Sequence, residues 1–151
     1  MRGALSRVAP SASVFTGCAR GVDRLVRASV PSERLVVFAV SGGARSRGVF
    51  AQRSVRLVSG VAGAGGALVV FPGVVCPPAL RPSASASRCF AGHGSGSWAS
   101  AAFALGSGVP VLLWLPSWLT VGPPPGWGFE HLGGQWFLGV PAGQQLALPV
   151  C

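Results

Sequence analysis

The chain has 151 residues, of which 50% are hydrophobic and 10% charged, and its formal net charge is +9 at pH 7. This composition argues against intrinsic disorder of the whole chain, because disordered chains combine low hydrophobicity with high charge. The length fits one domain with a hydrophobic core, and the positive charge favours anionic partners such as a nucleotide, a nucleic acid or an anionic membrane.

All twelve cationic residues are arginines, and the chain contains no lysine, asparagine, isoleucine or tyrosine. The abundant residue types (Gly, Ala, Val, Pro and Arg) have GC-rich codons, which indicates a GC-rich bacterial genome. The alternative is a translated reading frame that was never selected as a protein, and the ordered apolar patterning described below argues against it. The arginines lie singly between Arg2 and Arg88, unlike the dense runs of a nucleic-acid-binding tail.

The four cysteines, Cys18, Cys76, Cys89 and Cys151, form no C-x-x-C pair and have no histidine at zinc-ligand spacing. We therefore expect free thiols, no bound metal and no cofactor. Neither a secretory signal nor a dense cysteine framework is evident, so the expected compartment is the cytoplasm.

The segment Ala101–Val121 is nearly continuous in apolar residues and has the length of a membrane span. Pro110 would break a spanning helix near its middle, and two glycines and a second proline interrupt the segment further. A helix that ends at Leu105, followed by a glycine turn and a buried strand, fits these residues better. We therefore expect no membrane insertion.

Apolar runs alternate with segments of helical periodicity along the first 115 residues. Predicted strands cover Ser13–Phe15, Leu35–Val40, Ala67–Phe71 and Val109–Leu115, and predicted helices cover Gly21–Val30, Val49–Ser59 and Ser97–Leu105. Leu35–Val40 is typical of a strand buried on both faces. We expect a short connector at Gly60–Gly66 and a loop at Pro72–Ala91. This order predicts an α/β fold with a Rossmann-like, open and mostly parallel sheet flanked by helices.

The C-terminal part of the chain has a different character. Three prolines, Pro123–Pro125, precede a segment in which aromatic residues flank Gly133 and Gly134. Two glycines between aromatic runs predict a β-hairpin. We therefore expect a domain over residues 1–121 and a hairpin extension over residues 122–151 that packs on it.

Two glycine-rich turns, Thr16–Asp23 and Gly92–Ser97, each open a predicted helix. Glycine lets the backbone approach a phosphate, and the free amides and the helix dipole then stabilise it. Since ligands of open parallel sheets lie at the carboxyl ends of the strands, we expect both turns to share one ligand. The candidate binding residues are Gly17, Cys18, Ala19, Gly21 and Asp23 in the first turn, Arg53 and Ser54 on the second predicted helix, and Gly94, Ser95, Gly96 and Ser97 in the second turn.

Two of these residues have competing interpretations. Asp23 is expected either to orient a ribose or a turn amide, or to stabilise the N-terminus of its helix through the helix dipole. Arg53 is expected either to pair with a ligand phosphate or to be an ordinary solvated residue on its helix.

These segments resemble the SLOG superfamily, the Rossmann-like group that contains the Smf/DprA and LOG proteins. Thr16–Asp23 resembles its GxAxGxD turn, Phe50–Ser54 its arginine-bearing helix, Leu68–Gly73 its strand ending in Pro-Gly, and Gly94–Ser97 its GxGT turn, followed by Ala101–Ala104 and Gly108–Val111 as helix and last strand. The resemblance covers about residues 13–115 and implies a phosphate-bearing, nucleotide-derived ligand. It also implies a strand ending in Gly-Ser-Arg before Thr16, which an N-terminal truncation would remove.

The chain departs from the LOG pattern at the residues that would carry catalysis. LOG phosphoribohydrolases have a glutamate three residues after the GxGT threonine, where this chain has Ser100, and roughly twenty residues separate Gly73 from the second turn. The chain therefore lacks a carboxylate that could act as general acid or base in this region. We therefore predict a binding domain without assigned catalytic residues. The alternatives are a LOG-like nucleotide-processing hydrolase and a DprA-like DNA-binding protein, and a homodimer is a further candidate assembly.

Overall fold

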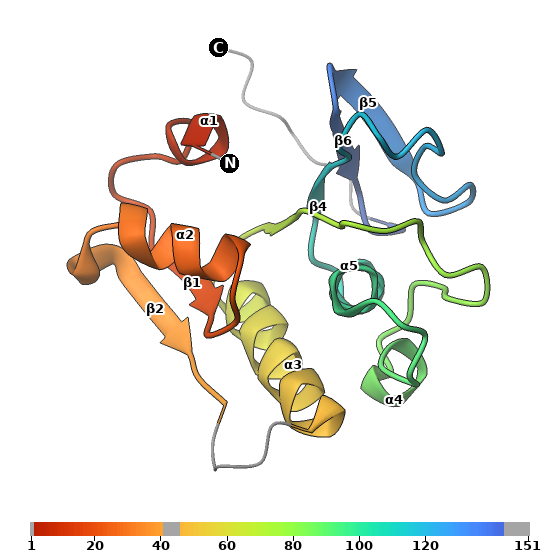
Figure 1. Ribbon diagram of the computed structural model, residues 1–151, viewed down its shortest axis with the longest axis horizontal. Helices are drawn as coiled ribbons and strands as arrows, with labels where there is room; N and C mark the ends of the chain where they lie inside the picture. The colour runs from red at the N-terminus through yellow and green to blue at the C-terminus, as the bar shows by residue number, and fades with distance from the viewer. Residues whose placement is uncertain (1, 41–45, 144–151) are drawn as a thin grey trace. The chain divides into compact units, whose positions relative to one another are not determined.

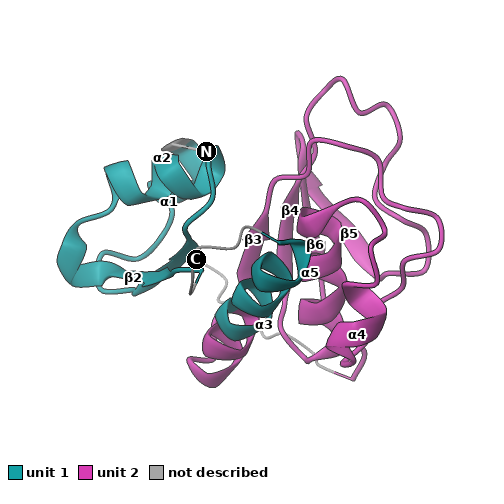
Figure 2. Cartoon of the chain, turned by 60° about the horizontal axis from the view of Figure 1, so that its bottom comes forward, with its two compact units in different colours: residues 1–57 teal, residues 58–151 magenta. Residues whose placement is uncertain are grey.

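The computed structural model describes residues 2–40 and 46–143 of the chain (Figure 1). Its elements in chain order are α1 (Arg2–Leu5), β1 (Val14–Gly17), α2 (Val22–Ser29), the 3-10 helix η1 (Ser32–Arg34), β2 (Leu35–Phe38), α3 (Arg47–Gly63), β3 (Leu68–Val70), α4 (Ala86–Cys89), α5 (Gly96–Gly106), β4 (Val111–Trp114), β5 (Phe129–Gly133) and β6 (Trp136–Gly139). The chain divides into two compact units, unit 1 (residues 1–57) and unit 2 (residues 58–151), with the boundary inside α3 (Figure 2).

Unit 1 contains a parallel pair of strands, β1 and β2, joined through α2. Their register runs from Val14 opposite Leu35 to Gly17 opposite Phe38. A parallel pair needs a crossover connection, which α2 supplies. The prediction that the Leu35–Val40 run is buried on both faces is wrong, because Val36 and Val37 are 42% and 44% exposed. Among the described strands β2 pairs with β1 alone, so it lies at the edge of a two-stranded sheet.

Unit 2 contains a four-stranded sheet with the order β3-β4-β6-β5. Strands β3 and β4 are parallel, whereas β4–β6 and β6–β5 are antiparallel. The predicted C-terminal hairpin is therefore present as β5 and β6, and it extends the sheet beside β4. A mixed α/β fold is confirmed, but the described strands form two sheets. A two-residue turn at Gly134 and Gln135 joins β5 and β6, and a turn this short requires antiparallel pairing.

The apolar core of the described residues lies in unit 2 and is densest on α5. Trp98 and Ala102 on this helix are 1% and 0% exposed, and the Trp98 ring meets Trp127 edge-on at a centroid distance of 5.9 Å. At the end of α5, a Cβ atom on Gly106 would overlap the backbone of Ser83. The small residues of this helix thus let the preceding loop pack against it.

Two predicted segments differ from the structure. Helix α3 continues through Gly60 to Gly63, so the expected connector begins later, and the expected loop Pro72–Ala91 contains the short helix α4. The apolar segment Ala101–Val121 is divided between α5 and β4. None of the described helices has the length and apolar character needed to cross a membrane. Residues 41–45, which follow the predicted strand Leu35–Val40, lie outside the described residues.

Candidate functional site

The first predicted site lies within unit 1, where β1 leads through a short turn into α2. Gly17 ends β1, Cys18, Ala19 and Gly21 form the turn, and Asp23 is the second residue of α2. Gly21 precedes the helix with a φ of 80°, a conformation that glycine adopts without steric cost. A strand, a glycine turn and a helix therefore follow one another as the sequence predicts.

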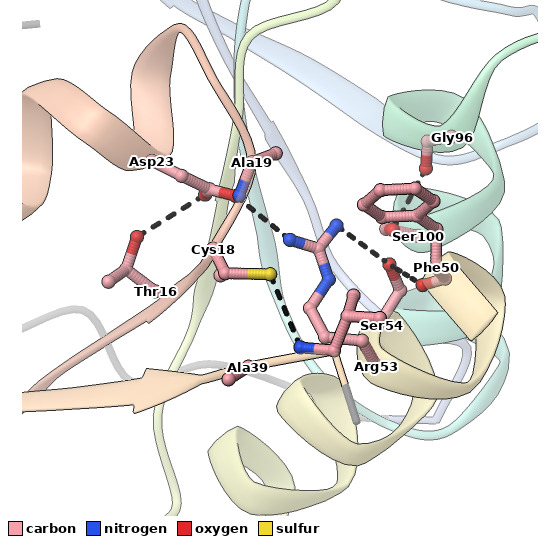
Figure 3. A network of polar contacts seen from close by, with 12 residues as sticks. Thr16, Cys18, Ala19, Asp23, Ala39, Phe50, Arg53, Ser54, Gly96 and Ser100 are labelled. Atoms are coloured by element: carbon pink, nitrogen blue, oxygen red, sulfur yellow. Dashed lines mark hydrogen bonds and ion pairs between the residues drawn. The ribbon is translucent and has the colours of Figure 1, made fainter. Parts of the chain in front are cut away.

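The Asp23 carboxylate folds back over this turn (Figure 3). Its Oδ2 accepts a hydrogen bond from the backbone N–H of Ala19 at 3.1 Å, and its Oδ1 accepts one from the hydroxyl of Thr16 at 3.3 Å. Thr16 is 3% exposed, the one buried polar side chain of the described residues. Asp23 thus orients a turn amide, as one of its two interpretations proposed. Thr16 was not among the predicted site residues. The available signal was a hydroxyl near the end of a strand, within reach of a carboxylate in the following helix.

Arg53 extends from α3 to the same carboxylate. Its Nη1 lies 2.9 Å from Asp23 Oδ2, and the side chains of Arg53 and Asp23 are 13% and 26% exposed. The interpretation of Arg53 as a solvated helix residue is therefore wrong. Its Nη2 donates to the hydroxyl of Ser54 at 3.5 Å, which in turn donates to the carbonyl of Phe50.

One nitrogen of Arg53 has no hydrogen-bond partner among the described residues. The Nε atom is buried and makes no hydrogen bond within the described part of the chain. Buried polar atoms in folded proteins are nearly always hydrogen-bonded, and an exception is usually explained by a water, an ion, local strain or a catalytic role.

Arg27 supports the other side of the turn and was missed by the sequence analysis. Its guanidinium donates to the carbonyl of Gly17 at 2.5 Å and to the carbonyl of Ala19 at 3.2 Å. The available signal was its position on α2 four residues after Asp23, because residues with this spacing share one helix face. The side chain of Cys18 also has a structural contact, since its Sγ accepts a hydrogen bond from Val40 N at 3.3 Å.

Positive charge is concentrated in unit 1. Ten of the twelve arginines and two of the three acidic residues, Asp23 and Glu33, precede residue 58, which gives this part of the sequence a net charge of +8. Unit 2 contains Arg81, Arg88 and Glu130 and has a net charge of +1. The positive formal charge of the chain is therefore carried mainly by unit 1.

The second predicted turn, Gly92–Ser97, lies within unit 2 and opens α5. Gly92 and Gly94 have φ values of 85° and 92°, and Gly96 and Ser97 are the first two residues of the helix. The Ser95 hydroxyl caps α5 by accepting a hydrogen bond from Trp98 N at 3.4 Å. Since Trp98 Nε1 donates to the carbonyl of Val74, the turn lies beside the segment that follows β3. The two turns belong to different units, and a ligand shared between them stays a prediction.

Two thiols of unit 2 are poorly suited to nucleophilic chemistry. Burial raises the pKa of Cys76 to about 11, although the nearby Arg81 lowers it in part. Burial also raises the pKa of Cys89. Because the thiolate is the reactive form, these thiols are largely protonated at neutral pH. No group of three or more His, Cys, Asp or Glu side chains within residues 2–40 and 46–143 could hold a metal ion.

No protein-family model, curated protein or solved structure matches this chain.

Proposed function

We propose that the chain is a Rossmann-like binding domain for a phosphate-bearing, nucleotide-derived ligand, with its main site at the turn Thr16–Asp23 and Arg53. The observation that carries this proposal is the placement of Arg53. Its guanidinium is mostly buried at a glycine turn between a strand and a helix, and one of its nitrogens is buried without a hydrogen-bond partner in residues 2–40 and 46–143.

The chemistry of arginine fits this ligand class. Its guanidinium is planar, always charged, and presents N–H groups in a fork that matches two oxygens of a phosphate. In Arg53 one edge of this fork is neutralised by Asp23 at 2.9 Å, while Nε has a proton to donate and no acceptor among the residues that the structure describes. A ligand oxygen would supply that acceptor. The proposal includes Gly94–Ser97 as a second binding segment, on the strength of its resemblance to the GxGT turn.

Ligand titration tests the site. The chain is titrated with AMP, ADP, ATP and ADP-ribose, and binding is measured by thermal shift and calorimetry. The Arg53→Gln variant should bind the best of these at least tenfold more weakly, since a hydrogen bond to a charged group contributes about 1.5–3 kcal/mol. The matched control is Arg24→Gln, which removes the same charge from an exposed position on α2 of the same unit and should change affinity less than about threefold.

Two results would contradict the proposal. The first is no binding of any of these compounds by the wild-type chain. The second is an equal loss of affinity in the two variants, which would mean that general charge rather than the geometry at Arg53 attracts the ligand.

Binding of nucleic acid is a second candidate function, favoured by the net charge of +8 carried by residues 1–57. Affinity that arises from phosphate contacts falls steeply as salt is raised. A gel shift of a DNA or RNA oligonucleotide that weakens between about 50 and 200 mM salt would support this function. The absence of a gel shift at about 50 mM salt would contradict a nucleic-acid-binding function.

A further inference from the structure

We infer that the Asp23 carboxylate is an internal anion that occupies the hydrogen-bond donors of the first turn, so that a ligand phosphate binds there by displacing it. The inference rests on the proposed function, because it states how that same site is regulated. It assigns Asp23 as a competitor of the ligand instead of a ligand-binding residue.

The contacts of Asp23 are those that a phosphate oxygen would make. One atom, Oδ2, receives both the Ala19 N–H at 3.1 Å and the Arg53 Nη1 at 2.9 Å. The other oxygen receives the Thr16 hydroxyl at 3.3 Å. A backbone amide at a glycine turn and an arginine are the donors that anion sites use. In this structure the chain supplies the anion itself (Figure 3).

The two anions compete electrostatically. A phosphate that paired with Arg53 would lie within a few ångströms of the carboxylate, where like charges repel. The turn does not depend on Asp23 alone, because Arg27 binds the carbonyls of Gly17 and Ala19 independently. Asp23 is also 26% exposed, so its carboxylate has access to solvent when it leaves the turn.

Replacement of the charge tests the inference. Asparagine has the size of aspartate and keeps one acceptor oxygen, but it has no charge. Asp23→Asn should therefore bind AMP about five- to tenfold more tightly than the wild-type chain, measured by calorimetry at low salt. The matched control is Glu33→Gln, which removes the same charge from an exposed position of the same unit. Its affinity for AMP should stay within about twofold of wild type.

A second measurement reports directly on the hydrogen bond between the Ala19 amide and Asp23. Hydrogen exchange of the Ala19 amide should be faster in Asp23→Asn than in the wild-type chain, since the amide loses a charged acceptor. Saturating AMP should slow it again in the variant. If Asp23→Asn does not fold by circular dichroism, Thr16→Val replaces it. This variant removes one donor that holds the carboxylate, and it should raise AMP affinity by a smaller factor.

The outcomes separate this inference from the proposed function. Tighter binding by Asp23→Asn but not by Glu33→Gln supports it. Weaker or unchanged binding by Asp23→Asn overturns it while leaving the proposed function standing, and an equal gain in both variants overturns it as a general charge effect. If the wild-type chain binds none of AMP, ADP, ATP and ADP-ribose, the proposed function fails and the inference fails with it.

Discussion

Arg53 lies against the backbone of Gly17, at the point where β1 enters the turn. A Cβ atom placed on Gly17 would be 2.8 Å from Arg53 Cζ and 2.5 Å from Asp23 Oδ2, and it would overlap Arg53 Nη1. Gly21, in the same turn, has open space around its α-carbon but a φ of 80°. The two glycines therefore meet different needs: Gly17 leaves room for a side chain of α3, and Gly21 allows the backbone to turn.

Gly17→Ala should destabilise unit 1, because the added methyl group would displace the guanidinium of Arg53 and break its pairing with Asp23. Overpacking of this kind costs about 1–3 kcal/mol, and we expect the free energy of unfolding to fall by that amount. Urea unfolding followed by far-ultraviolet circular dichroism measures it. The control is Gly48→Ala, where the added Cβ meets only Ser46 Oγ at 3.8 Å. That variant should be neutral or slightly stabilising, because alanine favours helix, and equal losses in both would contradict the assignment.

Thr16→Val should lower the stability of the same unit by about 1 kcal/mol, the usual contribution of one hydrogen bond. Valine has nearly the shape of threonine but cannot donate to Asp23 Oδ1. Amide hydrogen exchange at Ala19 offers the most local measurement, since its partner Asp23 would lose an anchor. Thr16→Ser retains the hydroxyl and should preserve that protection. A Thr16→Val variant with unchanged exchange would show that the bond is not formed in solution.

Ser95→Ala should destabilise unit 2 by about 1 kcal/mol through loss of the α5 cap. All five tryptophans lie in unit 2, so the midpoint of urea unfolding followed by tryptophan fluorescence reports this change. Ser97→Ala, two residues further along, removes a hydroxyl that does not cap the helix. It should leave the midpoint nearly unchanged. Similar shifts in the two variants would argue against Ser95 as the cap.

Cys76 should react slowly with iodoacetamide in the folded chain. Burial raises the pKa of its thiol from 9.0 to about 11, so the folded state favours the protonated form. The stability that this protonation contributes is present below pH 9 and is lost as pH rises towards 11. The alkylation rate, followed by peptide mass spectrometry, should therefore keep rising to about pH 11 in the folded chain but level off near pH 9 in guanidinium chloride. Arg81→Gln should slow the reaction further, because Arg81 lowers this pKa, whereas Arg88→Gln should not. A plateau near pH 9 in the folded chain would count against the raised pKa.

Strand and helix positions were largely readable from the sequence because local periodicity decides them. The apolar runs at Val14–Gly17 and Val111–Trp114 form strands, and α2 ends at Ser29, two residues before Pro31. The burial of a strand was less predictable. Leu35–Phe38 has the composition of a strand that is buried on both faces. Burial, however, depends on whether other elements cover each face of the sheet, and the composition of a strand does not show this.

The candidate site was predictable only in part for a related reason. The glycines of the first turn, Asp23 and Arg53 were all recognisable by type and position. Their pairing was not, since an ion pair between α2 and α3 joins residues thirty positions apart. Arg27 and Thr16 also acquire their roles from partners that the fold brings to them.

Composition and short-range spacing are sufficient to establish an apolar core, a strongly basic N-terminal part and glycine turns before two helices. The contacts within the first turn depend instead on the fold. It brought Arg53 to Asp23 and turned the carboxylate onto the Ala19 amide. A long-range contact of this kind depends on how the helices pack against their strands. That packing cannot be predicted from short-range sequence patterns.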